Sequence, residues 1–346
     1  MKYLIVQDWR STSGNHAGMV HMCNLLKDKY PNDYTVIKIP ITRNLLLRII
    51  YKIFKIINHK MFWLIRLYIF CKPMIKNLKK GDEVFLLEYC FPLVSQYEIA
   101  EYLRKKRPYI KINALSHLTP SFFGSKDAYI EIVKKWSVPI DKMMTLGTSL
   151  SNFFIECGLE KSRISTGFHY VDNDFYKKNG TIAINEKLRL IVMGNMQRNY
   201  RMLVDICNQT PNVEWVICCG GKAHIIDLFS SIPNVTTKGY LDEEELKNEM
   251  NKADISVNIM HDTIGSNVIT TSLSMGLALI CSDVGSIRDY CNDKNTIFCE
   301  NNVDSFVKAI NYLSNNKEIL LEMKKESIEL SSKLTIENIH YWFCNL

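Results

Sequence analysis

The chain has 346 residues, of which 47% are hydrophobic and 23% charged, a composition that excludes a disordered or fibrous protein and predicts two domains. Lys and Arg total 43 against 36 Asp and Glu, and ten of the basic residues lie in 43–80, where no acidic residue occurs. The other 33 basic and 36 acidic residues make the rest of the chain slightly acidic, which excludes a nucleic-acid-binding protein that is basic throughout.

The cysteines and the apolar runs of the sequence indicate in which cellular compartment the protein is expected. The eleven cysteines form no C-x-x-C pair, so they predict reduced thiols in a cytoplasmic protein and neither a zinc site nor a disulfide framework. Five basic residues interrupt the apolar region 45–71, and the N-terminal apolar run is short. We therefore expect no transmembrane helix and no signal peptide.

Short apolar runs alternate with helical stretches in the first half of the chain. We predict strands at 3–7, 34–39, 83–87, 110–115 and 142–146, and helices at 17–29 and 95–106. This alternation predicts a parallel sheet with helical crossovers. Since ligands of such sheets bind beyond the carboxyl ends of the strands, the loops at those ends are the places to search for a site.

The basic segment 43–80 lies between the second and third of these strands. Arg48, Lys52 and Lys55 recur at helical spacing, and large apolar residues including Trp63 lie among the basic ones. A basic, aromatic-rich amphipathic helix can lie in a membrane interface with its cations toward anionic lipid. The pattern predicts this membrane contact, while a helix packed on the sheet with a solvated basic face stays open as an alternative. We expect no nucleic-acid partner, because no nucleic-acid module is present.

A second series of strands begins after the polar stretch 171–187. We predict strands at 188–193, 213–218, 234–237, 254–258, 277–281 and 296–299, and helices at 200–208, 242–251, 267–275 and 303–314. The sequence therefore predicts an N-terminal domain over 1–175 and a C-terminal domain over 176–332. The last segment, 333–346, is expected to cross back and pack on the first domain.

An ordered set of features runs from Gly239 to Tyr290. The helix 242–250 is followed by the apolar run 253–257, then by the turn and helix 265–276, and then by the segment 278–290. This set resembles the donor-binding domain of GT-B nucleotide-sugar glycosyltransferases, in particular the large retaining family of bacterial polysaccharide synthesis, the glycosyl transferases group 1. The resemblance implies two Rossmann-like α/β domains that face across a cleft.

The turn Gly265-Ser266-Asn267 opens the predicted helix 267–275. Free N–H groups and the positive end of the helix dipole suit a diphosphate, so we expect this turn to hold the donor. The family also places cations after the first strand of this domain. The cations available here to neutralise the diphosphate are Arg198, Arg201 and Lys222.

Two residues depart from the family pattern, which has two glutamates seven residues apart around this turn. The aligned positions are Thr263 and Thr271, and a hydroxyl forgoes the strength of a charge-assisted hydrogen bond. Three interpretations stay open. Thr271 contacts a ribose without a 2′-hydroxyl, as in a dTDP-sugar; Asp262 takes over a carboxylate role; or the donor site has lost activity.

The resemblance also implies a role for the first domain. Gly14 and Asn15 follow the first strand and correspond to the family's first glycine-rich loop, and His117 corresponds to a histidine that contacts the donor sugar. We assign His117 and Asp262 as candidate catalytic residues. Asp172-Asn173-Asp174 matches an Asp-x-Asp metal motif only superficially, since it lies in the expected linker. No metal and no cofactor are predicted.

The sequence thus predicts an enzyme that moves a sugar from a nucleotide-sugar donor to a lipid-linked oligosaccharide acceptor. We expect it at the inner face of the cell membrane, in the synthesis of O-antigen, capsule or exopolysaccharide, with retention at the anomeric carbon implied by the resemblance. Two alternatives stay open: a nucleotide-sugar epimerase of the same fold, and a non-catalytic partner subunit, which only the threonines at 263 and 271 favour.

Overall fold

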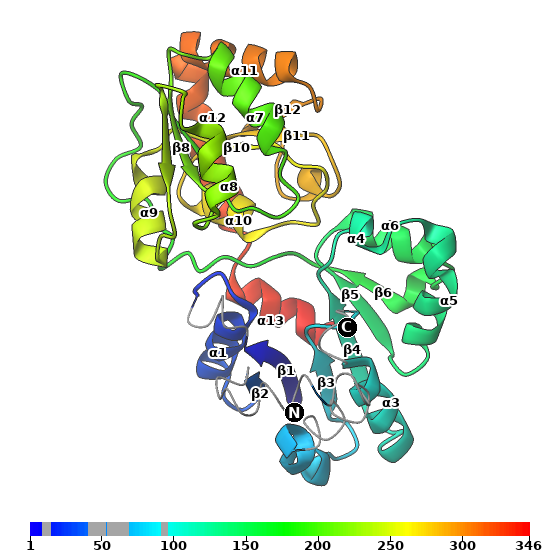
Figure 1. Cartoon of the computed structure of the whole chain (residues 1–346). Coiled ribbons are helices and arrows are strands. Elements are labelled where there is room, and N and C mark those ends of the chain that lie inside the picture. Colours follow the sequence, from blue (N-terminus) through cyan, green and yellow to red (C-terminus); the bar gives the residue numbers. More distant parts are fainter. Residues whose placement is uncertain (9–14, 41–52, 54–68, 91–95) are drawn as a thin grey trace. The chain divides into compact units, whose positions relative to one another are not determined.

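The computed structural model describes the chain except for residues 9–14, 41–52, 54–68 and 91–95. The described residues form two compact units, shown in Figure 1. Unit 1 comprises Met1–Gly167 together with Ile339–Leu346, and unit 2 comprises Phe168–Asn338.

Unit 1 is built on a six-stranded parallel sheet with the order β2-β1-β3-β4-β5-β6. The strands are β1 (Lys2–Asp8), β2 (Tyr34–Pro40), β3 (Glu83–Leu86), β4 (Lys111–Ser116), β5 (Lys142–Thr145) and β6 (Ile164–Thr166). Five of them were predicted from the sequence. The sixth, β6, was missed because it is a partly exposed edge strand of three residues and has no apolar run to signal it.

The helices of unit 1 follow the apolar spacing of the sequence. They are α1 (Met19–Lys29), α3 (Gln96–Lys106), α4 (Pro120–Phe123), α5 (Lys126–Ser137) and α6 (Thr148–Glu156), and residues 69–77 are also helical. In α1 the buried residues Met22, Cys23 and Leu26 lie on one face, as the 3.6-residue period requires. These helices connect successive strands of the sheet. Parallel strands require such crossover connections, because the chain must return to the same edge before the next strand begins.

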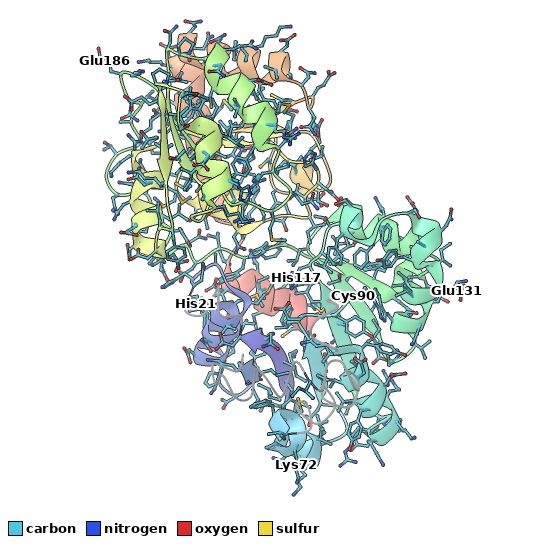
Figure 2. All side chains as sticks on the ribbon, in the orientation of Figure 1. His21, Lys72, Cys90, His117, Glu131 and Glu186 are labelled. Atoms are coloured by element: carbon cyan, nitrogen blue, oxygen red, sulfur yellow. The ribbon has the colours of Figure 1, made fainter. Side chains whose placement is uncertain are left out.

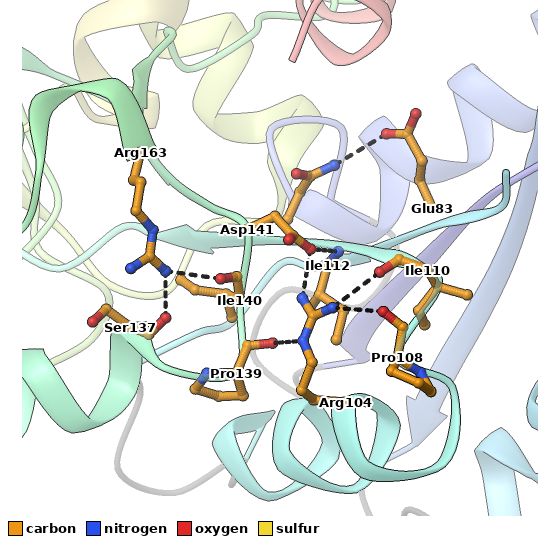
Figure 3. A network of polar contacts seen from close by, with 11 residues as sticks. Glu83, Arg104, Pro108, Ile110, Ile112, Ser137, Pro139, Ile140, Asp141 and Arg163 are labelled. Carbon is orange, nitrogen blue, oxygen red and sulfur yellow. Dashed lines mark hydrogen bonds and ion pairs between the residues drawn. The ribbon is translucent and has the colours of Figure 1, made fainter. Parts of the chain in front are cut away.

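A polar network fixes the amino edge of this sheet (Figure 3). The Arg104 guanidinium donates to Asp141 Oδ2 at 2.6 Å and to the Pro139 carbonyl at 3.1 Å, and Asp141 Oδ2 also accepts from the Ile112 N–H at 2.7 Å. Nearby, Glu83 Oε2 accepts from Asn113 Nδ2 at 3.1 Å. These contacts hold the starts of β3, β4 and β5 together, at the edge opposite to the one where ligands of such sheets bind.

The last helix, α13 (Ile336–Cys344), brings the C-terminus to unit 1. Figure 1 shows it in red beside the sheet of this unit, where Phe343 stacks on Phe85 of β3 with ring centroids 4.7 Å apart. The indole N–H of Trp342 donates to Ser165 Oγ at 2.8 Å, and the Tyr34 hydroxyl lies 2.9 Å from His340 Nδ1. The C-terminal residues are therefore part of the core of unit 1.

Unit 2 contains a second six-stranded parallel sheet, in the order β12-β11-β10-β7-β8-β9. Its strands are β7 (Arg189–Met193), β8 (Glu214–Cys218), β9 (Val235–Lys238), β10 (Ile255–Asn258), β11 (Ala278–Ser282) and β12 (Thr296–Cys299). All six were predicted from the sequence. β10 and β11 are buried along their whole length, as expected for central strands with helices on both faces.

The helices of unit 2 are α7 (Tyr200–Gln209), α8 (Ala223–Ile226), α9 (Glu243–Lys252), α10 (Asn267–Ser274), α11 (Val303–Asn315) and α12 (Lys317–Ser331). The start of α9 has a capping box, in which Asp242 accepts from the Glu245 N–H and Glu245 accepts from the Asp242 N–H. The two sheets with their helices confirm the predicted α/β class of two Rossmann-like domains.

The division between the units falls after Gly167, earlier than the boundary predicted after residue 175. The residues between these points are bound to unit 2. The His169 N–H donates to the Tyr290 hydroxyl at 2.8 Å, and the Val171 N–H donates to the Leu334 carbonyl at 2.9 Å. The polar composition of this stretch gave no sign of these contacts, because they are made with residues more than a hundred positions away.

Candidate functional site

The carboxyl edge of the unit 2 sheet brings together the loops that follow β7 and β10. The Asn199 N–H donates to the Ile259 carbonyl at 3.1 Å, and the His261 N–H donates to the Gln197 carbonyl at 3.0 Å. Arg198 and Met260 form a β-bridge between these two contacts. Segments some sixty residues apart in the sequence therefore make one rigid rim, as expected at the point where ligands bind to such sheets.

Arg198 is held within this rim by the ends of two strands. Its Nε donates to the Met193 carbonyl at 3.3 Å, and its Nη2 donates to Asn258 Oδ1 at 3.2 Å. Burial lowers the pKa of the guanidinium below its usual value, although an arginine stays protonated in proteins. No carboxylate of the described residues forms an ion pair with Arg198. A half-buried cation of this kind is suited to an anionic ligand.

The start of α10 lies beside the loop that carries this cation. Gly265 has a φ of +91°, and a Cβ placed on it would lie 2.2 Å from the Tyr290 hydroxyl, so only glycine fits the turn. Ser266 caps the helix, since its Oγ accepts from the Ile269 N–H. A Cβ on Gly194, in the loop that holds Arg198, would lie 3.4 Å from Val268 Cγ2. The arginine loop and the helix N-terminus are therefore immediate neighbours.

This arrangement leaves backbone donors for a ligand. Among the described residues, no atom accepts a hydrogen bond from the N–H groups of Asn267 and Val268, which are two of the four that every helix leaves unpaired at its start. The positive end of the helix dipole adds to the charge of Arg198. Gly265, Ser266, Asn267 and Arg198, which are candidates from the sequence, thus lie together in one corner of unit 2. We call it the anion-binding corner because its charge and its backbone donors suit an anion.

Thr263 and Thr271, which stand where the family pattern has glutamates, both use their hydroxyls within the fold. Thr271 is buried, and its hydroxyl donates to the Asn267 carbonyl at 2.6 Å. Thr263 Oγ1 accepts from the Gly265 N–H at 3.3 Å and so stabilises the glycine turn. Each hydroxyl keeps a lone pair for a ligand, but the proton of Thr271 is already engaged.

Asp262 is the carboxylate that the structure places next to this turn. Its Oδ1 accepts from the Thr263 N–H at 2.8 Å, and its side chain is half-buried. A Cβ on Gly285, which follows β11, would lie 2.6 Å from the same oxygen. Asp262 therefore lies between the loops after β10 and β11, where a carboxylate can reach a ligand of the anion-binding corner.

The two other predicted cations are placed differently. Arg201 lies in the first turn of α7 with an exposed side chain, and Lys222 precedes α8 and is also exposed. Gly220 and Gly221 have φ values of +71° and +75°, and this turn brings Lys222 to the carboxyl end of β8. The structure fixes neither cation in the way that it fixes Arg198, so neither is preorganised for an anion.

In unit 1, His117 follows β4 at the carboxyl edge of the sheet. Its Nε2 lies 2.5 Å from Glu88 Oε2, and the side chain of Glu88 is 1% exposed against 25% for His117. Burial lowers the pKa of His117, but the charge and the hydrogen bond of Glu88 outweigh burial and raise the pKa above its ordinary value. Figure 2 labels His117 and, from the loop after β3, Cys90.

Glu88 was not predicted from the sequence as a site residue. The available signal was its position, directly after the predicted strand 83–87, where polar side chains of parallel sheets reach the ligand-binding edge. Asn15, which was predicted, opens α1 by accepting from the Ala17 N–H at 2.8 Å. This contact explains Asn15 as part of the strand-to-helix turn, whereas Gly14 lies outside the described residues.

Most of the predicted membrane-facing segment also lies outside the described residues, including Arg48, Lys52, Lys55 and Trp63. Its end is described. In the helical residues 69–77 and just after them, Cys71, Met74 and Leu78 are buried, while Lys72, Lys76, Lys79 and Lys80 are exposed. In the parts of the chain that the structure describes, no helix is both long enough and apolar enough to cross a membrane.

Comparisons with known proteins agree with this geometry. Residues 187–316 match the family described as glycosyl transferases group 1. No curated protein sequence matches the chain significantly. Among solved structures, Anabaena HepE in complex with UDP has 11% identity and a TM-score of 0.73, with 99% of this chain and 98% of that chain covered.

Two further structures show the same similarity over the whole chain. The lipopolysaccharide outer core galactosyltransferase WaaB has 13% identity and a TM-score of 0.73, and both chains are covered to 100%. A glycosyltransferase from Rickettsia africae has 13% identity and a TM-score of 0.69, with 99% of this chain and 97% of that chain covered. At these identities the similarity establishes the fold.

Proposed function

We propose that the chain, which has the GT-B fold, is a glycosyltransferase of group 1 that uses a nucleotide sugar, and that it transfers the sugar to a lipid-linked glycan at the inner face of a bacterial membrane. The observation that carries the donor part is the corner formed by Arg198 and the N-terminus of α10. A cation without a paired carboxylate in the described part of the chain, next to free backbone donors, suits the diphosphate of a nucleotide sugar.

The proposed reaction breaks the bond between the anomeric carbon and the diphosphate oxygen and forms a bond from that carbon to an acceptor oxygen. The departing diphosphate takes the bonding electron pair, and the proton of the acceptor hydroxyl passes to an oxygen of that diphosphate. Arg198 and the N–H groups of Asn267 and Val268 would stabilise the charge that grows on the diphosphate. Retention at the anomeric carbon is part of the proposal and rests on the family resemblance.

Asp262 is the better candidate for the carboxylate role in donor binding. The hydroxyl proton of Thr271 is used by the helix, so Thr271 can only accept a hydrogen bond from a ribose hydroxyl. Asp262 has a half-buried carboxylate between two loops of the anion-binding corner, and a carboxylate binds a sugar hydroxyl about twice as strongly as a neutral acceptor does.

The acceptor part of the proposal rests on charge. Residues 43–80 contain ten basic residues and no acidic residue, and the four lysines at its described end are exposed. Cations near an anionic membrane contribute about 1 kcal/mol each. A lipid-linked acceptor lies at such a surface, so this segment would bring unit 1 to it. The role in O-antigen, capsule or exopolysaccharide synthesis belongs to the same proposal.

A donor panel tests the proposed function. Titrating the full-length protein with UDP-, GDP- and dTDP-sugars in a calorimeter should identify one nucleotide, and the same donor should be consumed when a lipid-linked glycan is present. Failure of the folded protein to bind any of them would overturn the proposal. Isomerised nucleotide sugar without transfer would instead indicate an epimerase.

Two conservative variants distinguish the candidates for ribose binding. Asp262→Asn keeps the shape of the side chain but removes its charge, and Thr271→Val keeps the shape but removes the hydroxyl. We expect the first to weaken nucleotide binding about tenfold, the loss of a charge-assisted hydrogen bond, and the second to change it little. The reverse order would assign the role to Thr271.

A further inference from the structure

Glu88 and His117 form a buried ion pair at the carboxyl edge of unit 1. The carboxylate is 1% exposed, and its Oε2 lies 2.5 Å from His117 Nε2. Placing a carboxylate in such a position is costly unless a cation and hydrogen bonds accompany it. The imidazolium form of His117 supplies the cation, so the pair is most stable with the ring protonated.

Gln96 fixes Glu88 from the other side. Its Oε1 accepts from the Glu88 N–H at 2.7 Å, and its Nε2 donates to the Ile5 carbonyl at 3.3 Å. Gln96 is itself buried, at the start of α3. Gln96 therefore ties the backbone of Glu88 to that of β1, while the Glu88 carboxylate contacts His117, whose ring is partly exposed at the carboxyl edge of the sheet.

The backbone beside Glu88 is strained. Among the described residues, two that are not glycine have a positive φ: Cys90 at 65° and Gln197 at 56°. Cys90 lies two positions after Glu88, and Gln197 directly precedes Arg198. Such strain is found at functional sites, where the surrounding structure holds a side chain in one place. The loop that carries Glu88 and the loop that carries Arg198 thus each contain a non-glycine residue with a positive φ.

Two acceptors at the same edge have no hydrogen-bond partner among the described residues. Gln7 Oε1 and Asp8 Oδ1 are buried, and no described residue donates a hydrogen bond to either. Both belong to the end of β1, which pairs with β3, the strand that precedes Glu88. Buried polar atoms are almost always paired, and a ligand that carries hydroxyl groups would supply donors to these two oxygens. A sugar or another polyol has this chemistry.

We infer that Glu88 is a positioning residue for the transfer reaction, which holds the His117 ring in one orientation and keeps it protonated, so that a fixed positive charge faces the hydroxyl-bearing substrate. The inference rests on the proposed function, because it assigns this edge of unit 1 to sugar recognition. In this role His117 is a cation and not a proton acceptor.

The charge of His117 has a defined pH dependence. Because the pKa of His117 is raised in the folded protein, the contribution of the pair to stability is complete below the ordinary histidine pKa and is lost as the pH rises through the raised pKa. From α1, the Cys23 thiol lies within the influence of the Glu88 charge, and burial followed by that charge raises the pKa of the thiol. The Cys23 thiol therefore stays neutral over the range in which His117 titrates.

Glu88→Gln is the decisive variant, since it keeps the shape and an acceptor oxygen but removes the charge. We expect the NMR-determined pKa of His117 to fall in E88Q, and the alkaline limb of the kcat profile to move to lower pH by the same amount. At a fixed pH on that limb, kcat should fall tenfold for each unit by which the pKa of His117 falls, and KM should stay almost unchanged. The matched control is Glu83→Gln, at the opposite end of β3, which should change neither quantity.

A double-mutant cycle tests whether Glu88 acts through His117. If it does, E88Q/H117Q should be no less active than H117Q alone. Activity losses that multiply, or a His117 pKa that E88Q leaves unchanged, would overturn the inference. Should E88Q fail to fold, the wild-type titration still decides, because a His117 pKa at or below 6.5 is incompatible with the role assigned to Glu88.

The titration is independent of the proposed function. A folded protein that binds no nucleotide sugar but shows a raised His117 pKa would refute the glycosyl transfer proposed above and leave the ion pair intact. A protein that transfers sugar with an ordinary His117 pKa would refute only the role of Glu88.

Discussion

At the residue scale, two charged side chains lie at positions where burial makes a charge costly for the stability of the fold. Arg198 is a half-buried cation held by a backbone carbonyl and an amide oxygen, and Glu88 is a buried carboxylate that contacts His117 and whose backbone N–H is bound by Gln96. Each lies within two residues of a strained non-glycine position. Charges that are costly to place and rigidly held are typical of sites that stabilise charge during a reaction.

Arg198→Ala is expected to lower kcat/KM by about 10²–10³-fold, because it removes a preorganised charge from the diphosphate. Arg198→Lys should restore part of this activity, since it keeps the charge but not the two-point attachment to Met193 and Asn258. Steady-state kinetics with the donor identified by the panel measure both effects.

The matched control for Arg198 is Arg189→Gln. Arg189 begins β7, the strand that leads to Arg198, and it pairs with Glu249 at 2.8 Å on the amino edge of the sheet. We expect this variant to keep its kcat/KM. Equal losses in the two arginine variants would show that the effect is structural and would remove Arg198 from the proposed mechanism.

At the element scale, a short glycine turn decides what α10 can do. Gly265 lets the chain pass the Tyr290 ring, and Tyr290 is fixed in turn by the His169 N–H. The start of α10 is thus attached to the segment between β11 and β12 and to the first residues of unit 2. A helix N-terminus that is rigid and capped presents its N–H groups without further ordering, which lowers the entropic cost of binding an anion.

Gly265→Ala should destabilise unit 2 by about 1–3 kcal/mol, because alanine is strained at positive φ and its Cβ would collide with Tyr290. Nucleotide affinity should fall with it, since the turn would move away from Arg198. Calorimetric unfolding and nucleotide titration measure the two effects.

Gly239→Ala is the comparison for Gly265→Ala. A Cβ on Gly239 meets no heavy atom within 4 Å, and its φ is not in the left-handed range. Its melting temperature should stay close to that of the wild type. A Gly265→Ala protein as stable as Gly239→Ala would contradict the close approach to Tyr290.

At the scale of the whole molecule, charge is unevenly distributed along the chain. Ten basic residues fall within 43–80, and the rest of the chain has a small excess of acidic residues. The described part, 69–80, buries its apolar side and exposes its lysines. A concentrated positive field of this kind attracts an anionic surface, and the attraction weakens as salt is added.

Reversing three of these charges, in R48E/K52E/K55E, should abolish binding to anionic phospholipid vesicles in a sedimentation assay, at a cost of about 1 kcal/mol for each cation lost. The variant K308E/K325E/K333E makes the same change of charge on exposed sites of unit 2 and should still bind. Equal binding by both variants would count against the membrane proposal.

The class of the fold and most of its helices and strands can be predicted from the order of residues alone. Apolar runs of strand length alternating with amphipathic helices specify parallel sheets, because both faces of such sheets must be covered. The glycine turn at 265–267 was readable for the same local reason. What the sequence missed was short or polar, such as β6, or depended on distant partners, such as the attachment of residues 168–175 to unit 2.

The tertiary structure alone decided which polar groups act together. Arg198, Arg201 and Lys222 are equivalent cations in the sequence, yet only Arg198 is fixed by the ends of two strands. Glu88 is a site candidate because β3 pairs with β4, and this pairing brings the Glu88 side chain next to His117. Charge pairing depends on distances of a few ångströms between segments far apart in the chain, and the order of strands in a sheet sets those distances.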